Sequence, residues 1–156
     1  MTEQETIDRM MMEQIENECF VDLSEILELP PVALSFGEYK YNSKSGMKTA
    51  PVPIGTYGNF SFIQAPPKSM KTFFISLLTS VYLSPSGQNR FGGKIKGHRD
   101  GKCVLHFDTE QGKYHAQRVF KRVIDMNDDA DVGCYHTFGL RAVGYKTRLK
   151  FIEYYM

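Results

Sequence analysis

The residues best suited to chemistry lie between positions 65 and 72, in the run Ala-Pro-Pro-Lys-Ser-Met-Lys-Thr. An apolar stretch precedes this run and a longer apolar stretch follows it. The pattern Gly-x-x-x-x-Gly-Lys-[Ser/Thr] at such a place binds phosphate groups. Backbone N–H groups and the positive end of a helix cradle the phosphates, the lysine reaches the outer ones and the hydroxyl binds Mg²⁺. Because Lys71 and Thr72 fit this pattern, the run predicts a phosphate-binding loop.

The loop departs from the pattern at its glycines. Ala65 and Met70 replace them, and Pro66 and Pro67 have no N–H to contribute, so a cradle must come from residues 68–72, which are Lys68, Ser69, Met70, Lys71 and Thr72. If position 70 needs a positive φ, a side chain there costs on the order of 1–2 kcal/mol. An alternative interpretation is a basic turn in which Ser69 caps the following helix.

The elements that must position this loop alternate along the chain. Extended apolar runs precede amphipathic or apolar runs of helical length, which predicts a parallel sheet covered on both faces. Functional groups then belong beyond the carboxyl ends of the strands. We expect strands at 59–63, 103–107 and 134–138, and helices at 71–83, 114–126 and 146–156, the second helix turning Val119, Phe120, Val123 and Ile124 inward.

The first fifty-eight residues read differently. Residues 1–30 carry nine acids and the single base Arg9, and apolar residues recur there at three- and four-residue steps, which predicts an acidic amphipathic helical arm. The stripe comprises Ile7, Met10, Met11, Ile15, Cys19 and Phe20. Two places for this arm are left open: it docks on the body of the same chain or on a neighbouring subunit. A second short helix is expected at 24–29, and a hairpin and loop lead-in at 31–58 with turn formers that include Pro51, Pro53 and Gly55.

Composition limits the class of protein. The chain has 156 residues with 42% apolar and 24% charged residues, which excludes a collagen, wholesale disorder and a membrane bundle. No basic leader followed by an apolar run begins the chain, so we expect a cytoplasmic protein with no membrane contact. The three cysteines lie at long spacings and are expected to be small buried residues without chemistry.

The charge of the body suggests a polyanionic partner. Beyond residue 30 the net charge is +9, against −8 before it. Glycines and bases recur over 84–102, so this loop is expected to be exposed and mobile. Its bases at 90–102 leave two interpretations open, a solvated connection and a surface that contacts the phosphate backbone of DNA. No metal-ligand spacing joins the histidines and cysteines, and His106 within an apolar run is expected to be a hydrogen-bonded core residue.

Residues 63–80 resemble the first strand and Walker A region of RecA-like P-loop ATPases, in particular the AAA family ATPases that act as RepA-type replication helicases of plasmids and mobile elements. Their loop is commonly Gly-x-Pro-Lys-Ser-Gly-Lys-Thr. The run Asp108-Thr109-Glu110, which closes an apolar strand, resembles the second strand of the same superfamily. The resemblance covers about residues 55–156.

The resemblance implies a three-layer α/β domain over 59–156 that binds ATP and Mg²⁺ and acts in DNA replication or mobilisation. It implies that Glu110 orients the water that attacks the γ-phosphate and that Thr72 holds Mg²⁺; Asp108 is a second candidate for the metal. Alternatively, Asp108 and Glu110 only cap the next helix. The chain ends where the family has its Walker B strand, so we expect a domain incomplete at its C-terminus, weakly active alone, and a homo-oligomer in its full-length form.

Two other functions remain open at this point. A degenerate P-loop scaffold can serve as a nucleotide-independent module that binds DNA or a protein; the replacements at Ala65 and Met70 favour it. A nucleotide kinase is a further possibility, which would need a lid and an acceptor site after the third strand.

Overall fold

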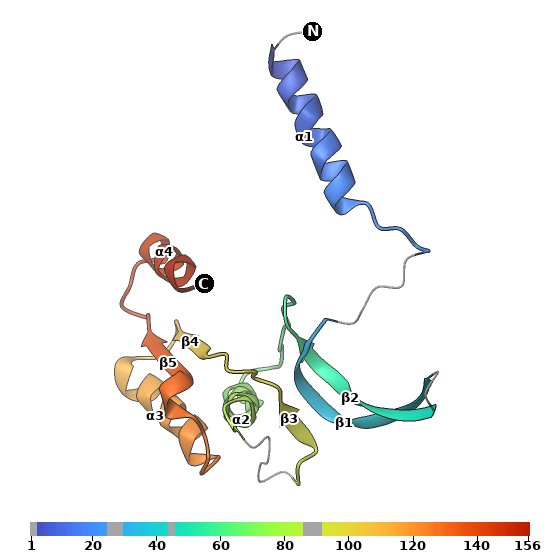
Figure 1. Ribbon diagram of the computed structural model, residues 1–156. Helices are drawn as coiled ribbons and strands as arrows, with labels where there is room; N and C mark the ends of the chain where they lie inside the picture. The colour runs from blue at the N-terminus through green and yellow to red at the C-terminus, as the bar shows by residue number, and fades with distance from the viewer. Residues whose placement is uncertain (1–2, 25–29, 44–45, 86–91) are drawn as a thin grey trace.

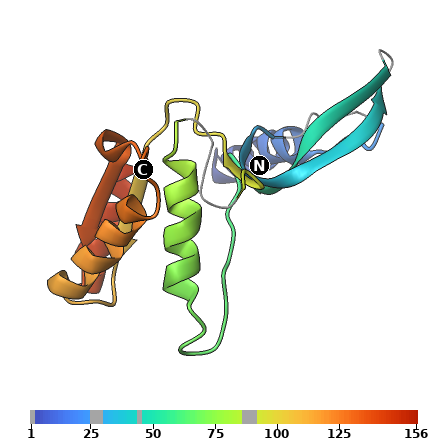
Figure 2. The same ribbon diagram turned by 90° about the horizontal axis from the view of Figure 1, so that it is seen from below.

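The computed structural model describes residues 3–24, 30–43, 46–85 and 92–156. These residues form a mixed α/β structure with a three-stranded antiparallel sheet, in the order β2-β1-β3, and a two-stranded parallel sheet of β4 and β5. Helix α2 lies between the two sheets (Figures 1 and 2). The elements in chain order are α1 (Glu3–Cys19), β1 (Val32–Ser43), β2 (Gly46–Thr56), α2 (Lys71–Tyr82), β3 (Ile95–Gly97), β4 (Val104–Asp108), α3 (Lys113–Asp125), the 3₁₀ turn η1 (Val132–Cys134), β5 (Tyr135–Gly139) and α4 (Tyr145–Tyr155).

The predicted hairpin is confirmed, although its strands are longer than expected. Strands β1 and β2 pair from Val32 opposite Thr56 to Ser43 opposite Gly46, with register shifts between Val32 and Glu38. Pro51 and Pro53, which we expected in turns, lie within β2. Because β2 is an edge strand of its sheet, a missing N–H there removes no ladder bond from an inner strand.

The glycine-rich segment before β4 is not simply an exposed loop, as the sequence predicted. Within it, β3 pairs antiparallel with β1, and His98 Nε2 lies 2.8 Å from the hydroxyl of Ser35. Gly97 passes so close to the end of α2 that a Cβ atom there would lie 2.6 Å from the Cα atom of Tyr82. The segment is therefore tied to the hairpin sheet and to α2. Residues 86–91, including Arg90, lie outside the described part of the chain.

The second half of the body follows the predicted order closely. Strands β4 and β5 and helices α3 and α4 appear within one residue of the expected bounds. A small core joins Leu83, Val123 and Tyr135, and Phe120 and Ile124 pack against it from α3. His106 is hydrogen-bonded to the Tyr135 hydroxyl at 2.7 Å, and burial lowers its pKa, which confirms a core histidine.

The predicted strand at 59–63 does not form. Residues 59–66 have no regular secondary structure, and the side chains of Phe60 and Phe62 are 92% and 90% exposed. An extended apolar run becomes a strand only when a neighbour pairs with its backbone groups, and no described strand lies in that position. The parallel sheet of the described residues therefore comprises β4 and β5 alone, rather than three strands.

The acidic arm is a helix, as predicted, and points away from the rest of the chain (Figure 1). Its apolar residues are exposed, Ile7 at 54% and Met10 at 65%. The expected second short helix falls on 25–29, outside the described residues. Cys19 and Cys103 are exposed, so the prediction of buried cysteines is wrong for both, while Cys134 is half-buried. Among the described helices, none combines the length and apolar character needed to cross a membrane.

Candidate phosphate-binding loop

The segment 65–70 forms the loop that leads into α2, at the place where the sequence predicts it. Lys71 begins the helix, and its Nζ donates a hydrogen bond of 2.6 Å to the carbonyl oxygen of Ala65. The lysine side chain therefore spans the loop from its last residue back to its first. This contact holds the ammonium group against the backbone of the loop.

The backbone of the loop adopts the conformation for which glycine is the usual residue. Lys68 has φ 64° and Met70 has φ 63° with ψ 21°, both in the left-handed region. Position 70 is the place of the second glycine in the Walker pattern. We predicted strain at Met70 if its φ is positive, and this condition is met. A Cβ atom in this region of backbone conformation costs about 1–2 kcal/mol.

The serine in the loop does not cap the helix. Met70 occupies the N-cap position without a side-chain capping bond, whereas the hydroxyl and the amide of Ser69 both donate to the carbonyl oxygen of Pro66, at 2.6 and 3.3 Å. The interpretation of the loop as a Ser69-capped turn is therefore wrong. Ser69 instead closes a tight turn with Pro66, and Lys68 lies inside this turn with its positive φ.

The amino end of α2 presents backbone donors. The amide of Phe74 donates to the carbonyl oxygen of Met70 at 3.0 Å, which is the i to i−4 bond that begins the helix. The amides of Lys71, Thr72 and Phe73 precede this bond and, as at every helix amino end, have no intrahelical acceptor. Together with the helix dipole they form a positive end suited to an anion. The amide of Ser69 is engaged with Pro66, so it is not part of the predicted cradle.

A hollow of about 560 Å³ lies over this end of α2. It is lined by residues 68–73 and by Arg122 of α3. The guanidinium of Arg122 lies 5.9 Å from the ring centre of Phe73. Three cationic side chains, Lys68, Lys71 and Arg122, therefore border one hollow. The sequence placed Arg122 among the bases of this helix, together with Arg118. It gave no sign that Arg122 lies beside the loop, because the two are fifty residues apart.

The Asp-Thr-Glu run lies at the carboxyl end of β4, as predicted. Asp108 Oδ1 accepts hydrogen bonds from the amides of Glu110 and Gln111, at 3.0 and 2.8 Å. Asp108 thereby fixes the turn that leads to α3, whose N-cap residue is Gly112. Glu110 is exposed. Neither acid lines the hollow at the loop, so the structure does not bring Glu110 or Asp108 into it.

The two strand-to-helix connections nevertheless share one end of the molecule. Figure 2 shows the loop before α2 and the turn between β4 and α3 at the same end. This is the end at which β4 and β5, being parallel, both finish. The predicted site residues of the two connections therefore lie at the same end of the molecule, as expected for an α/β structure. They do not share one hollow there.

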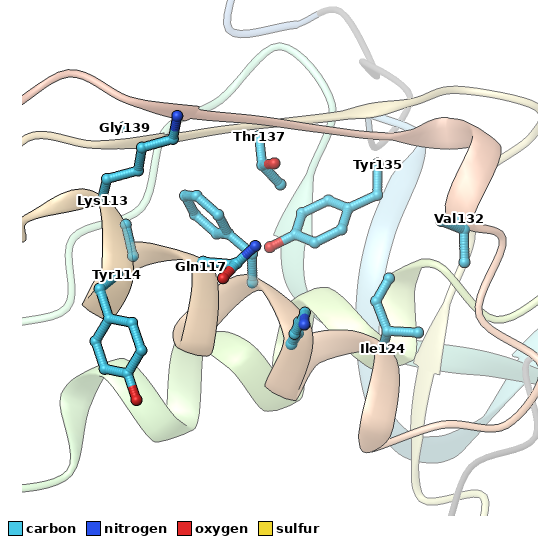
Figure 3. Close-up of a pocket in the computed structure, with 11 residues that line it drawn as sticks. Lys113, Tyr114, Gln117, Ile124, Val132, Tyr135, Thr137 and Gly139 are labelled. Carbon is cyan, nitrogen blue, oxygen red and sulfur yellow. The ribbon is translucent and has the colours of Figure 1, made fainter.

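A second, larger cavity lies between α3 and β5. It measures about 630 Å³, and its walls come from the two elements, with Gln117 on the helix and Thr137 on the strand (Figure 3). Phe120, Ile124 and Tyr135 make it mostly apolar, and burial raises the pKa of Tyr135. No residue of the 65–72 loop borders this cavity. Within the described ranges, no cluster of three metal-ligating side chains is found at either cavity or elsewhere.

Several bases of the predicted DNA-contacting loop are engaged within the chain. Arg99 Nη1 pairs with Asp131 at 2.8 Å and Lys96 Nζ with Glu38 at 2.8 Å. Lys102 lies 4.4 Å from the ring centre of Tyr57. These contacts use three of the bases to hold the segment in place. Helices α3 and α4 carry five further exposed bases, Lys113, Arg118, Lys121, Lys146 and Lys150.

Comparisons of this chain with protein-family models, with curated proteins and with solved structures found no match.

Proposed function

We propose that this chain binds the phosphate groups of ATP at the loop 65–72. One observation carries the proposal: Met70 has the left-handed φ of the Walker glycine, and Lys71 and Thr72 follow it at the amino end of α2. A plain turn between a loop and a helix needs no such conformation in a residue that disfavours it. The backbone at position 70 therefore has the conformation that the glycine of a phosphate loop would supply, which supports the proposal.

The roles of the residues follow from their positions. The amides of Lys71, Thr72 and Phe73 donate to phosphate oxygens at the helix end, and Lys71 exchanges its bond to Ala65 for the outer phosphates. Lys68 and Arg122 add positive charge across the hollow. Because Arg122 presents a planar set of donors, it suits two oxygens of one phosphate group.

We also propose that the body is a RecA-like P-loop ATPase domain, with Glu110 orienting the attacking water. The exposed hydroxyl of Thr72 beside Lys71 fits a ligand of Mg²⁺, which usually takes one or two protein oxygens together with phosphate and water. The bound ion would neutralise charge on the phosphates. Asp108 is the less suitable ligand, since one carboxylate oxygen already holds two amides. Bringing Glu110 to the phosphates requires a movement at the shared edge.

Calorimetric titration with Mg-ATP tests the binding proposal. We expect weak binding by the full chain, abolished in Lys71→Ala and retained in Lys150→Ala, a matched loss of one exposed lysine on α4. Arg122→Ala is expected to weaken binding by about tenfold, the equivalent of roughly 1.4 kcal/mol. Equal binding by the native chain and Lys71→Ala would remove the assignment. Absence of binding in all of them would favour a nucleotide-independent module.

The partners follow from the same proposal. ATP-driven work on DNA during replication or mobilisation of a plasmid or mobile element suits a cytoplasmic homo-oligomer whose exposed bases on α3 and α4 contact the DNA backbone. Such contacts read no sequence and weaken steeply with salt. Fluorescence anisotropy with a short duplex at rising salt tests them: reversal of Lys113 and Lys121 to Glu is expected to abolish binding, and unchanged affinity would refute this surface.

A further inference from the structure

Two of the three cysteines, far apart in the sequence, lie together in the fold. Strands β4 and β5 pair in parallel with Val104 opposite Tyr135, so Cys103 and Cys134 occupy the adjacent positions just before the first pair. Neighbouring strands lie about 4.7–4.9 Å apart, which falls within the Cα separation of disulfides, about 4.4–6.8 Å. Cys134 ends the 3₁₀ turn directly before β5 and Cys103 directly precedes β4, so the first strand pair brings the two residues close to disulfide distance.

The side chains meet as well as the backbones. A hydrogen bond between the thiols of Cys103 and Cys134 is the main cause of a raised pKa for Cys134, followed by burial and by the nearby Asp131. Asp131 is held by Arg99, and the amide of Cys134 donates to the carbonyl oxygen of Asp131 at 3.2 Å. Cys103 is exposed and Cys134 half-buried. The pair thus has one accessible member and one member fixed behind it.

We propose that Cys103 and Cys134 are a reversible redox-modification site that forms a disulfide across the two parallel strands. The oxidant is a small-molecule disulfide of the glutathione class. The thiolate of the exposed Cys103 attacks one sulfur of the oxidant, forming a mixed disulfide and releasing one small thiol. Cys134 then loses its proton and attacks Cys103 Sγ, which closes the protein disulfide and releases the second small thiol. Two thiol hydrogens and two electrons pass to the oxidant.

The consequence for the protein is a clamp at the amino ends of β4 and β5. This edge is opposite the carboxyl ends at which the strands meet the turn of Asp108. The link would close the strand–helix–strand unit that contains α3, and a cross-link of that kind stabilises by restricting the unfolded chain. We therefore expect oxidation to raise the unfolding temperature while leaving the 65–72 loop unchanged.

The test uses the full chain incubated with oxidised glutathione. We expect a Cys103–Cys134 peptide in the digest of the full chain, and in Cys19→Ser, which has no third thiol to take up glutathione, a product lighter by two hydrogen atoms; dithiothreitol restores the starting mass. The product is expected to unfold several degrees higher than the reduced chain. Cys19→Ser is the matched control and should close the same link, whereas Cys103→Ser and Cys134→Ser should not.

Three outcomes would overturn the proposal. The first is a stable glutathione adduct on Cys103 that Cys134 never displaces. The second is cross-linking between chains through Cys19 with no Cys103–Cys134 peptide. The third is closure of the link with no change or a fall in unfolding temperature, which would remove the clamp. Because mass and peptide mapping are the readouts, a variant that folds less well still reports whether the link forms.

Discussion

Two segments of the body, 59–82 and 103–125, both have the sequence pattern of a strand, a loop and a helix. We call them the first and the second unit, and their structures differ. In the second unit, β4 pairs with β5, and α3 buries Ala116, Val119 and Val123. In the first, residues 59–66 pair with no described strand, and Phe73 and Phe74 of α2 remain exposed at 43% and 45%. The same local pattern thus gives a packed unit only where a neighbouring strand is present.

The two connections differ in the same way. The turn after β4 is held by a carboxylate on two amides and ends at Gly112 with φ −65°, which any residue can adopt. The loop before α2 needs left-handed residues at positions 68 and 70 and has a lysine folded into it. The turn after β4 is therefore an ordinary turn. The loop before α2 has unfavourable backbone geometry of the kind that persists at functional sites.

The largest expected difference between the units is in stability. Phe120 of α3 packs edge-on against His106 with ring centres 4.9 Å apart, so Phe120→Ala should cost about 3 kcal/mol. Phe62→Ala removes a ring that is 90% exposed and should change the free energy of unfolding by less than about 0.5 kcal/mol. Urea unfolding measures both. Comparable losses would show that residues 59–63 pack in solution, contrary to the described fold.

Exposed apolar surface in the first unit predicts self-association. Phe60, Phe62, Phe73 and Phe74 present their rings to solvent, and exposed apolar surface favours association. We expect sedimentation velocity to show species larger than a monomer, and Phe60→Ser with Phe62→Ser to weaken association by about tenfold, roughly 1.4 kcal/mol. A monomeric native chain at high concentration would contradict the expectation.

Matched glycine exchanges test the two connections. Met70→Gly relieves a left-handed side chain and should stabilise the chain by about 1 kcal/mol while strengthening ATP binding by up to about tenfold. Gly112→Ala should be close to neutral, because its Cβ atom would meet only the Arg141 side chain, at 3.9 Å. Thermal unfolding and calorimetry read both out. A Met70→Gly chain that is less stable and binds no better would show that the loop is adapted to methionine.

The smallest expected effect concerns acid stability. The hydrogen bond from Arg99 is the main cause of a pKa of Asp131 below its ordinary 3.8. Since this pKa is lower in the folded chain, the pair's contribution is present above pH 3.8 and is lost as the pH falls through the lower folded value. Asp131→Asn should therefore flatten the stability profile below pH 4. If the free energy of unfolding of Asp131→Asn falls below pH 4 as steeply as that of the native chain, the ion pair does not contribute to stability in solution.

Much of the second unit was predictable because its signals are local. The apolar run at 103–107 and the stripe of Val119, Phe120 and Val123 identify a strand and a helix whatever their neighbours, and both formed within a residue of the expected bounds. The hairpin was predictable for the same reason. The prediction that Pro51 and Pro53 lie in turns was wrong, because an edge strand tolerates proline. Which strand lies at the edge depends on the order of strands in the finished sheet.

The remaining features depend on partners distant in sequence. Phe60 and Phe62 have strand character, yet pairing decides whether a strand forms. The segment of β3 gained its structure from β1, which no local pattern indicates. Arg122 joined the loop hollow through the packing of α3 on α2, and Cys103 met Cys134 through the parallel register. The conformation of Met70 was foreseeable only because the Walker pattern says where a glycine belongs.

We propose that the loop before α2 cradles phosphate and that the turn after β4 does not. An ¹⁵N NMR titration of the full chain with Mg-ATP tests it most directly. We expect shifts in the amide signals of Lys71, Thr72 and Phe73 that saturate with ATP and vanish in Lys71→Ala, while the amide signals of Glu110 and Gln111 stay unchanged during this binding. Shifts absent from 68–73, or unchanged in Lys71→Ala, would contradict it.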